Sequence, residues 1–354
     1  MKLSYFFLSI IFFLPSLFTN SYSINIPKLC NKKNKTCLFN TKKFITNPIN
    51  KNFNHIIPFQ KVNGFLELIR YKNILPTTFL FFSGAWMIKP NFMDLVRDKN
   101  VIYSFICTLL ILSSNMIAND LFDIKIDKIN NPGRPLISGK IKIKEAIFGL
   151  GLMLILVEII NIMVLPTKLQ NIIHLSILYS LMYTPLFKKI LFLKNISCAS
   201  MVAYSIFFGG LSVWRGGMDI NKIGFFYQII IFVFFGSLYN EILLDVCDYE
   251  GDKKNKLHTI PTVFGSNFAL NFSKNILLCN VYGNLAYLLK LGQIYYGFLF
   301  LLLCIPVLDD FYNIENKREL GEQKFSKKNI IEALNTSSKQ LIFILILFCL
   351  LVIR

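Results

Sequence analysis

The chain has 354 residues, of which 54% are hydrophobic and only 16% are charged. This composition excludes a soluble globular domain and is typical of a protein with several membrane-spanning segments. The excess of basic residues, which gives a net charge of +18, lies in polar loops and near the N-terminus, so we interpret it as the charge bias of a membrane protein and not as a nucleic-acid-binding surface.

The first 63 residues predict two targeting segments. Residues 1–23 combine a basic Lys2, an apolar stretch and a small-residue cleavage candidate, as a secretory signal does, although an uncleaved first membrane helix is the alternative. Residues 24–63 hold eight lysines and neither Asp nor Glu. Together they resemble the two-part leader of proteins sent to a secondary plastid such as the apicoplast, with a disordered basic tail as the alternative. We therefore expect a plastid membrane, or else the mitochondrial inner membrane or the endoplasmic reticulum.

Nine apolar segments follow and predict an all-α membrane domain over residues 64–354. They span approximately residues 65–88, 101–122, 145–165, 171–187, 196–214, 223–246, 268–289, 292–307 and 339–353, and the polar residues 308–338 are expected as a loop. Several segments are shorter than the roughly 20 residues of an upright membrane helix. Since short spans suit helices that surround a cavity, we expect about nine transmembrane helices in a bundle around a central cavity.

The distribution of basic residues supports this number of helices. With nine helices, the loops that follow the even-numbered ones carry 19 Lys and Arg residues, and the loops on the other side carry seven. Because basic loops stay on the side of insertion, the even-numbered connections are expected to face the cytosol or the plastid stroma.

An acidic cluster ends the second apolar segment. Asn119, Asp123 and Asp127 are four residues apart, so a helix would place them on one face, with Asp120 one position away. Carboxylates at the end of a membrane helix repel one another and are costly to desolvate. A bound metal ion would offset that cost, and the cluster therefore predicts a cation site.

A second acidic cluster ends the sixth apolar segment, on the same predicted side of the membrane. Asp245, Asp248 and Asp252 again share one helical face. Asp248 and Asp252 repeat the four-residue spacing of Asp123 and Asp127, about 125 residues later. The two clusters therefore indicate an internal repeat.

Two facing acidic clusters predict a magnesium-dependent site for a diphosphate. Hard oxygen ligands suit Mg²⁺, which usually shares its coordination shell with substrate phosphates. The expected metal ligands are Asn119, Asp123, Asp127, Asp245, Asp248 and Asp252. Such ions would neutralise charge as the diphosphate leaves, while the apolar bundle holds a hydrocarbon tail. A cation-conducting transporter is the alternative from another functional class.

These motifs resemble those of the UbiA-type intramembrane prenyltransferases, over about residues 64–354. The Asn-Asp-x-x-Asp-x-x-x-Asp motif of that family is matched by Asn119, Asp120, Asp123 and Asp127. The family's second motif, Asp-x-x-x-Asp, is matched by Asp248 and Asp252. Its Arg-Pro-x-x-Ser-Gly loop is matched by Arg134, Pro135, Ser138 and Gly139. Its Tyr and Lys motif has candidates in Tyr183 and Lys188, which are five residues apart where the family often has four.

The resemblance implies Mg²⁺-dependent transfer of a prenyl group from a polyprenyl diphosphate to an acceptor, through an allylic carbocation. The implied catalytic residues are Asp123, Asp127, Asp248, Asp252, Tyr183 and Lys188. The implied substrate-binding residues are Asn119, Asp120, Arg70, Arg134 and Lys140. The basic side chains of Lys188, Arg134 and Lys140 would bind diphosphate oxygens. Arg70 would face the acceptor, and the ring of Tyr183 would stabilise the carbocation.

The residues around the second motif bear on the acceptor. The form Asp-x-x-Asp-x-Glu-Gly-Asp at Asp245 to Asp252, followed by Thr-Ile-Pro, resembles the branch of plastid, cyanobacterial and archaeal members, which contains homogentisate, chlorophyll and geranylgeranylglyceryl phosphate prenyltransferases. We expect an aromatic acceptor in the synthesis of membrane quinones or tocopherol-like compounds. A non-aromatic acceptor, either a glycerol phosphate or a chlorin-type alcohol, is the alternative. The expected partners are the polyprenyl diphosphate, a hydrophobic or aromatic acceptor and the lipid bilayer, with no nucleic acid.

Overall fold

The computed structural model describes residues 59–216, 220–319 and 327–353, and the residues that it describes form helices without β-strands. Gly64–Arg354 forms one compact unit. The predicted signal at 1–23 and nearly all of the predicted leader at 24–63 lie outside the described residues, so both stay predictions.

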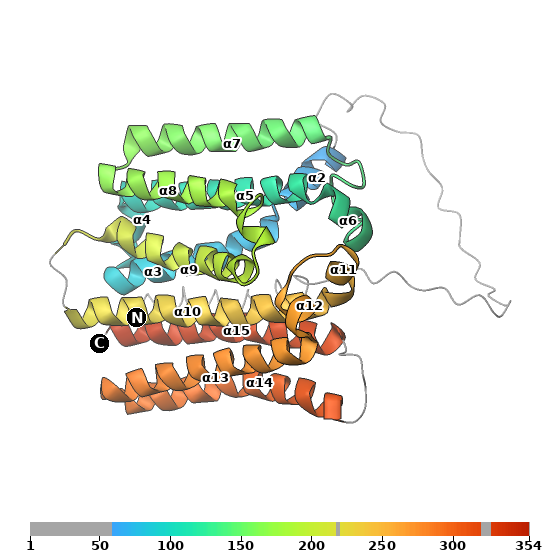
Figure 1. Cartoon of the computed structure of the whole chain (residues 1–354). Coiled ribbons are helices and arrows are strands. Elements are labelled where there is room, and N and C mark those ends of the chain that lie inside the picture. Colours follow the sequence, from blue (N-terminus) through green and yellow to red (C-terminus); the bar gives the residue numbers. More distant parts are fainter. Residues whose placement is uncertain (1–58, 217–219, 320–326, 354) are drawn as a thin grey trace, which may run out of the picture. The chain divides into compact units, whose positions relative to one another are not determined.

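Each of the nine predicted apolar segments contains all or most of one long helix or forms part of one, in the described part of the chain (Figure 1). These helices are α3 (Ile74–Ile88), α5 (Lys99–Phe122), α7 (Ile143–Val164), α8 (Thr167–Tyr183), α9 (Leu193–Val213), α10 (Ile220–Cys247), α13 (Ser266–Lys290), α14 (Ile294–Glu319) and α15 (Lys327–Val352). By length and composition, six of them could cross a membrane, namely α5, α7, α9, α10, α14 and α15. The expectation of an all-α polytopic membrane protein is confirmed.

The remaining described elements are short and connect the long helices. They are α2 (Phe59–Leu68), η1 (Tyr71–Asn73), α4 (Phe92–Arg97), α6 (Ile124–Asn130), η2 (Phe187–Lys189), α11 (Tyr249–Lys254) and α12 (Ile260–Phe264). In Figure 1, α6, α11 and α12 gather at one end of the bundle. Both acidic clusters therefore lie at the same end, as the charge of the loops predicted.

Two segment boundaries differ from the expectation. The first apolar segment, 65–88, is not one helix, because Arg70 has a φ of 52° and turns the chain between α2 and α3. The predicted loop 308–338 is mostly helical, because α14 continues to Glu319 and α15 begins at Lys327. Buried residues recur there at helical spacing, with Phe311 and Ile314 on α14 and Ile330, Ala333 and Leu334 on α15. The polar outer face of these extensions lowers their hydropathy without ending the helices.

Helices α3 and α9 pack together near the middle of the bundle, with their backbones in close approach. A Cβ atom on Gly84 would lie 1.9 Å from the carbonyl oxygen of Ile206, and one on Gly209 would lie 2.0 Å from that of Phe81. Small residues allow such contact between membrane helices. On one side, α9 also packs against α5, which contacts α7 and α8, and on the other it packs against α10, which contacts α13 and α15. The two clusters are therefore carried by helices that flank α9.

Candidate active site

Asp123 and Asp248 each stand at a joint between a long helix and a short one. Helix α5 ends just before Asp123 and α6 begins just after it, and α10 and α11 flank Asp248 in the same way. The backbone angles agree closely, with φ −88° and ψ 6° at Asp123 and φ −93° and ψ 3° at Asp248. Each stripe was expected on one unbroken helix, and this detail is wrong because ψ near 0° redirects the chain at the joint.

The joints nevertheless preserve the contacts between residues four apart. The amide of Asp127 donates to the carbonyl of Asp123 at 2.8 Å, and the amide of Asp252 donates to that of Asp248 at 2.9 Å. Asp123, Asp127 and Asp252 are buried, whereas Asp248 is exposed. The two motifs are thus the same structural device built twice.

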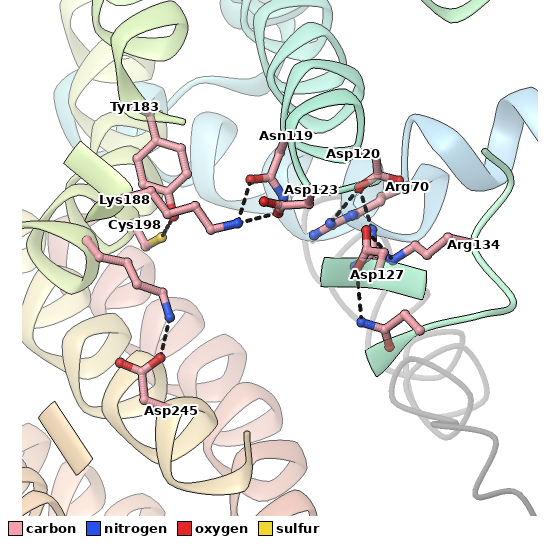
Figure 2. A network of polar contacts seen from close by, with 12 residues as sticks. Arg70, Asn119, Asp120, Asp123, Asp127, Arg134, Tyr183, Lys188, Cys198 and Asp245 are labelled. Carbon is pink, nitrogen blue, oxygen red and sulfur yellow. Dashed lines mark hydrogen bonds and ion pairs between the residues drawn. The ribbon is translucent and has the colours of Figure 1, made fainter. Parts of the chain in front are cut away.

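Arginine and lysine side chains neutralise the first cluster (Figure 2). Arg70 donates to Oδ1 of Asp120 at 3.2 Å, and Arg134 donates to the same oxygen at 2.5 Å. Lys188 forms an ion pair with Asp123 and also donates to Oδ1 of Asn119 at 3.3 Å. A buried carboxylate requires such partners, since an unpaired charge away from water is very costly.

Asp127 occupies the far end of this cluster. Nε of Arg134 lies 3.9 Å from its Oδ2, and the side-chain amide of Asn131 donates to its Oδ1 at 3.2 Å. Burial raises the pKa of Asp127, and the neighbouring Arg134 opposes that rise. Asp127 is therefore the least firmly neutralised of the buried carboxylates in the first motif.

Asp245 is the most fully paired carboxylate of the second cluster. Lys194 donates to its Oδ1, and the side-chain amide of Asn195 donates to its Oδ2 at 2.8 Å. Both donors come from the first turn of α9, so this contact fastens α9 to α10. With both oxygens engaged, Asp245 differs from the other expected metal ligands.

Asp252 presents a free oxygen. Its Oδ2 is buried without a hydrogen-bond partner. Burial raises the pKa of Asp252 to about 6, and Lys194 opposes that rise. A buried carboxylate oxygen without a partner costs folding free energy, and a bound cation would offset that cost.

The oxygen donors of the two clusters fit a hard divalent cation such as Mg²⁺. As the side chains lie, no three His, Cys, Asp or Glu groups among the described residues are close enough together to hold a metal ion. In the first cluster, Lys188 forms an ion pair with Asp123 and Arg134 forms one with Asp127. In the second cluster, Lys194 forms an ion pair with Asp245. The orphaned oxygen of Asp252 is the observation that agrees with a cation, and the predicted set of six ligands stays a prediction.

One connection supplies cations to both clusters. Lys188 lies in η2 and pairs with Asp123, and Lys194 lies in the first turn of α9 and pairs with Asp245. Between them, Phe192 has a φ of 64°, which residues with a side chain rarely adopt. Its ring lies 6.0 Å from that of Phe264, so packing helps to hold the turn. The connection between α8 and α9 therefore spans the space between the two motifs.

Two other expected site residues have partners other than the aspartates. Tyr183 is buried, and its hydroxyl lies 2.9 Å from Sγ of Cys198, within hydrogen-bond distance (Figure 2). Lys140 is not drawn to the clusters and instead donates to Glu67 at 2.7 Å.

Sequence reasoning missed three residues that the structure brings to the second cluster. Lys194 looked like ordinary loop charge, and Asn195 and Glu241 had no motif of their own. The one local signal was the position of Glu241, one helical turn before Asp245 on the same face of α10.

The chain matches known proteins along most of its length. A model of the UbiA prenyltransferase family matches residues 74–331. The digeranylgeranylglyceryl phosphate synthase of Methanosphaera stadtmanae is 30% identical over 269 residues, which are 75% of this chain and 93% of that protein. The synthase of the same name from Methanococcus aeolicus is 33% identical over 224 residues, which are 62% of this chain and 75% of that protein.

Solved structures share the fold. One, described as a digeranylgeranylglyceryl phosphate synthase in membranes, has a TM-score of 0.62 at 24% identity and covers 83% of this chain and 99% of its own. A UbiA homologue from Archaeoglobus fulgidus, bound to GPP and Mg²⁺, has a TM-score of 0.56 at 22% identity and covers 82% and 99%. These matches leave the transporter alternative without support. The chain belongs to the UbiA prenyltransferase family and is an integral membrane prenyltransferase.

Proposed function

We propose that this prenyltransferase moves a prenyl group from a polyprenyl diphosphate to a hydroxyl group of a glycerol-phosphate-type lipid, in a Mg²⁺-dependent reaction. The observation that carries the proposal is the pair of equivalent acidic joints, at Asp123 and Asp248, at one end of an apolar bundle. The carboxylates at the joints would bind the charged diphosphate through Mg²⁺, and the apolar bundle would hold the hydrocarbon chain of the same substrate.

The choice of acceptor revises the expectation of an aromatic ring. What supports a glycerol phosphate is the name of the reported relatives, which describes a product with two geranylgeranyl groups on glyceryl phosphate. These relatives favour the non-aromatic alternative, and nothing in them favours a quinone precursor. Geranylgeranyl diphosphate is accordingly the prenyl donor that we propose.

The basic residues of the first cluster are placed to bind phosphate oxygens. Arg70 and Arg134 share one carboxylate, Asp120, so together with it they keep a net positive charge. Lys188 has three N–H donors and directs them toward Asp123 and Asn119. Charge-assisted bonds from these groups to a diphosphate would fix its position at the membrane surface.

Mg²⁺ would be held by Asn119, Asp123, Asp127, Asp248 and Asp252. When bound, it would supply Lewis-acid stabilisation of the negative charge on the departing diphosphate. The structure of the Archaeoglobus fulgidus homologue with GPP and Mg²⁺ supports this use of the metal. Asp245, which was expected as a further ligand, we assign instead to positioning Lys194, because Lys194 and Asn195 occupy both of its oxygens.

The compartment stays a prediction. The plastid was inferred from residues 1–63 and from the resemblance of the second motif to the plastid, cyanobacterial and archaeal branch, and the reported relatives, which come from archaea, do not favour it. Imaging of residues 1–63 fused to a fluorescent protein tests the targeting segment directly.

A product assay tests the proposed activity. Purified protein with Mg²⁺ and labelled geranylgeranyl diphosphate is offered geranylgeranylglyceryl phosphate, homogentisate, 4-hydroxybenzoate or a chlorin-type alcohol. We expect an ether product with the glyceryl phosphate lipid. A product with the aromatic acceptors alone would refute the proposed acceptor while leaving prenyl transfer intact.

A further inference from the structure

Glu241 extends the acidic stripe of α10 into the apolar part of the bundle. It lies four residues before Asp245 and seven before Asp248, so it shares their helical face and sits about 10 Å deeper than Asp248 along the helix. It lies inside the candidate span Lys222–Cys247 and is half-buried, between the fully buried Tyr239 and Ile242. An ionisable group at such a depth is costly and usually has a function.

The polar neighbours of Glu241 come from every side of the inner site. Cys198 of α9 is a polar neighbour of its carboxyl group, and Lys194, Asp245 and Arg70 are the charged groups that act on it. Tyr183 of α8, whose hydroxyl lies 2.9 Å from Sγ of Cys198, completes the set. Tyr183, Cys198 and Glu241 therefore form a group of polar side chains on the inner side of the two acidic joints.

A purely structural role does not account for this carboxyl group. Lys194 already has Asp245 as its ion-pair partner, and Asn195 completes that contact. Arg70 is paired with Asp120. Both cations near Glu241 thus already have a carboxylate partner other than Glu241.

The position of Glu241 suits the reacting atoms of the proposed function, on which the inference rests. If the acidic joints hold the diphosphate and the helical bundle holds the prenyl tail, the first prenyl carbon lies at the boundary between the charged end and the apolar interior of the bundle. Glu241 lies on the inner side of that boundary. An acceptor hydroxyl that attacks this carbon must lose a proton there, away from bulk water.

We propose that Glu241 is a catalytic residue that accepts the proton of the acceptor hydroxyl. The bond between the first prenyl carbon and the diphosphate oxygen breaks, and its electron pair leaves with the diphosphate. The hydroxyl oxygen forms a bond to the same carbon, and its proton passes to a carboxylate oxygen of Glu241. Glu241 releases that proton to solvent once the ether product has departed.

The variant E241Q separates this role from a structural one, because Gln keeps the size of the side chain and its hydrogen bonds but accepts no proton. General-base catalysis contributes about 10²–10⁴-fold, so kcat for ether formation should fall at least about 100-fold. The KM for geranylgeranyl diphosphate and the Kd of its non-cleavable thiolo analogue with Mg²⁺ should change less than about threefold. The matched control is E158Q, since Glu158 of α7 pairs with His174 at 2.9 Å away from the clusters, and its kcat should equal that of the wild type.

Chemical rescue provides a second readout. Formate should restore ether formation in E241A, because it can occupy the vacated volume and accept the proton, and it should have no effect on E158A. Near-normal kcat in E241Q would overturn the inference, since the departing diphosphate would then suffice as proton acceptor. A parallel loss of analogue binding in E241Q, or absence of rescue in E241A, would equally overturn it. A wild-type enzyme that forms no ether would instead refute the proposed function.

Discussion

Asp123 and Asp248 hold the same backbone conformation at equivalent joints, although they lie about 125 residues apart in the chain. Each closes a long helix and opens a short one, and each is followed four residues later by a buried aspartate. From this relationship we infer that the two motifs are halves of one site, with α5 and α6 contributing one half and α10 and α11 the other.

The equivalence of the two joints predicts that neither can replace the other. We expect D123N and D248N each to lower kcat for prenyl transfer by about 10²-fold or more, because each removes a carboxylate that we propose as a ligand of the Mg²⁺ that would offset the negative charge of the departing diphosphate. Initial rates with labelled geranylgeranyl diphosphate measure the effect. The control is D94N on α4, where Asp94 forms an exposed ion pair with Lys89 at the end of α3, and this variant should keep the wild-type rate. A normal rate in either joint variant would contradict a two-sided site.

The pair of Lys194 and Asp245 predicts a stability effect independent of catalysis. K194M leaves a buried carboxylate without its cation, so we expect a loss of about 2–4 kcal/mol of unfolding free energy. The double variant K194M/D245N removes both charges and should recover part of that loss. Thermal unfolding in detergent gives the coupling energy through a double-mutant cycle. K254M, at an exposed residue of α11, is the control, and additive effects in the cycle would exclude the coupling.

Asp120 is predicted to act through its two arginines. D120N weakens the ion pairs that hold Arg70 and Arg134 in position. Removing a group that orients a ligand-binding side chain typically lowers affinity or activity by about 10–100-fold. We expect KM for the prenyl diphosphate to rise by about tenfold, with a smaller change in kcat. Steady-state kinetics separates the two parameters. A fall in kcat at unchanged KM would show that Asp120 belongs with the metal-binding carboxylates.

Helix packing around α9 predicts a contrast between two glycines. A Cβ at Gly209 would lie 2.0 Å from the carbonyl oxygen of Phe81, so G209A should cost at least about 1–3 kcal/mol by overpacking. Gly151, on α7, has no neighbour within 4 Å of its added Cβ, and G151A should be neutral or stabilising by up to about 1 kcal/mol. Thermal unfolding of both variants checks this, and equal stability would contradict the close contact of α3 and α9.

Much of the fold could be predicted from local pattern. Apolar runs marked all nine long helices, because a membrane helix must satisfy its backbone internally and face lipid or other helices with apolar side chains. The spacing of the aspartates predicted the position of both clusters and indicated that one repeats the other. The extensions of α14 and α15 escaped notice because buried residues such as Phe311 and Ile330 are interleaved with charges on an outward face.

The partners of the carboxylates could not be predicted, because they depend on tertiary contacts. Lys194 and Asp245 are 51 residues apart, and Lys188 and Asp123 are 65 apart. No local pattern distinguishes such lysines from ordinary loop charge. The turn at Arg70 was equally hidden, since a positive φ at a residue other than glycine is fixed by its surroundings.

The central claim is that the paired acidic joints hold a prenyl diphosphate through Mg²⁺. The most direct test is the binding of a labelled, non-cleavable geranylgeranyl thiolodiphosphate to the purified wild-type protein, with Mg²⁺ and with EDTA. We predict at least about tenfold tighter binding with Mg²⁺, and loss of that gain in both D123N and D248N. Equal affinity with Mg²⁺ and with EDTA would contradict the account.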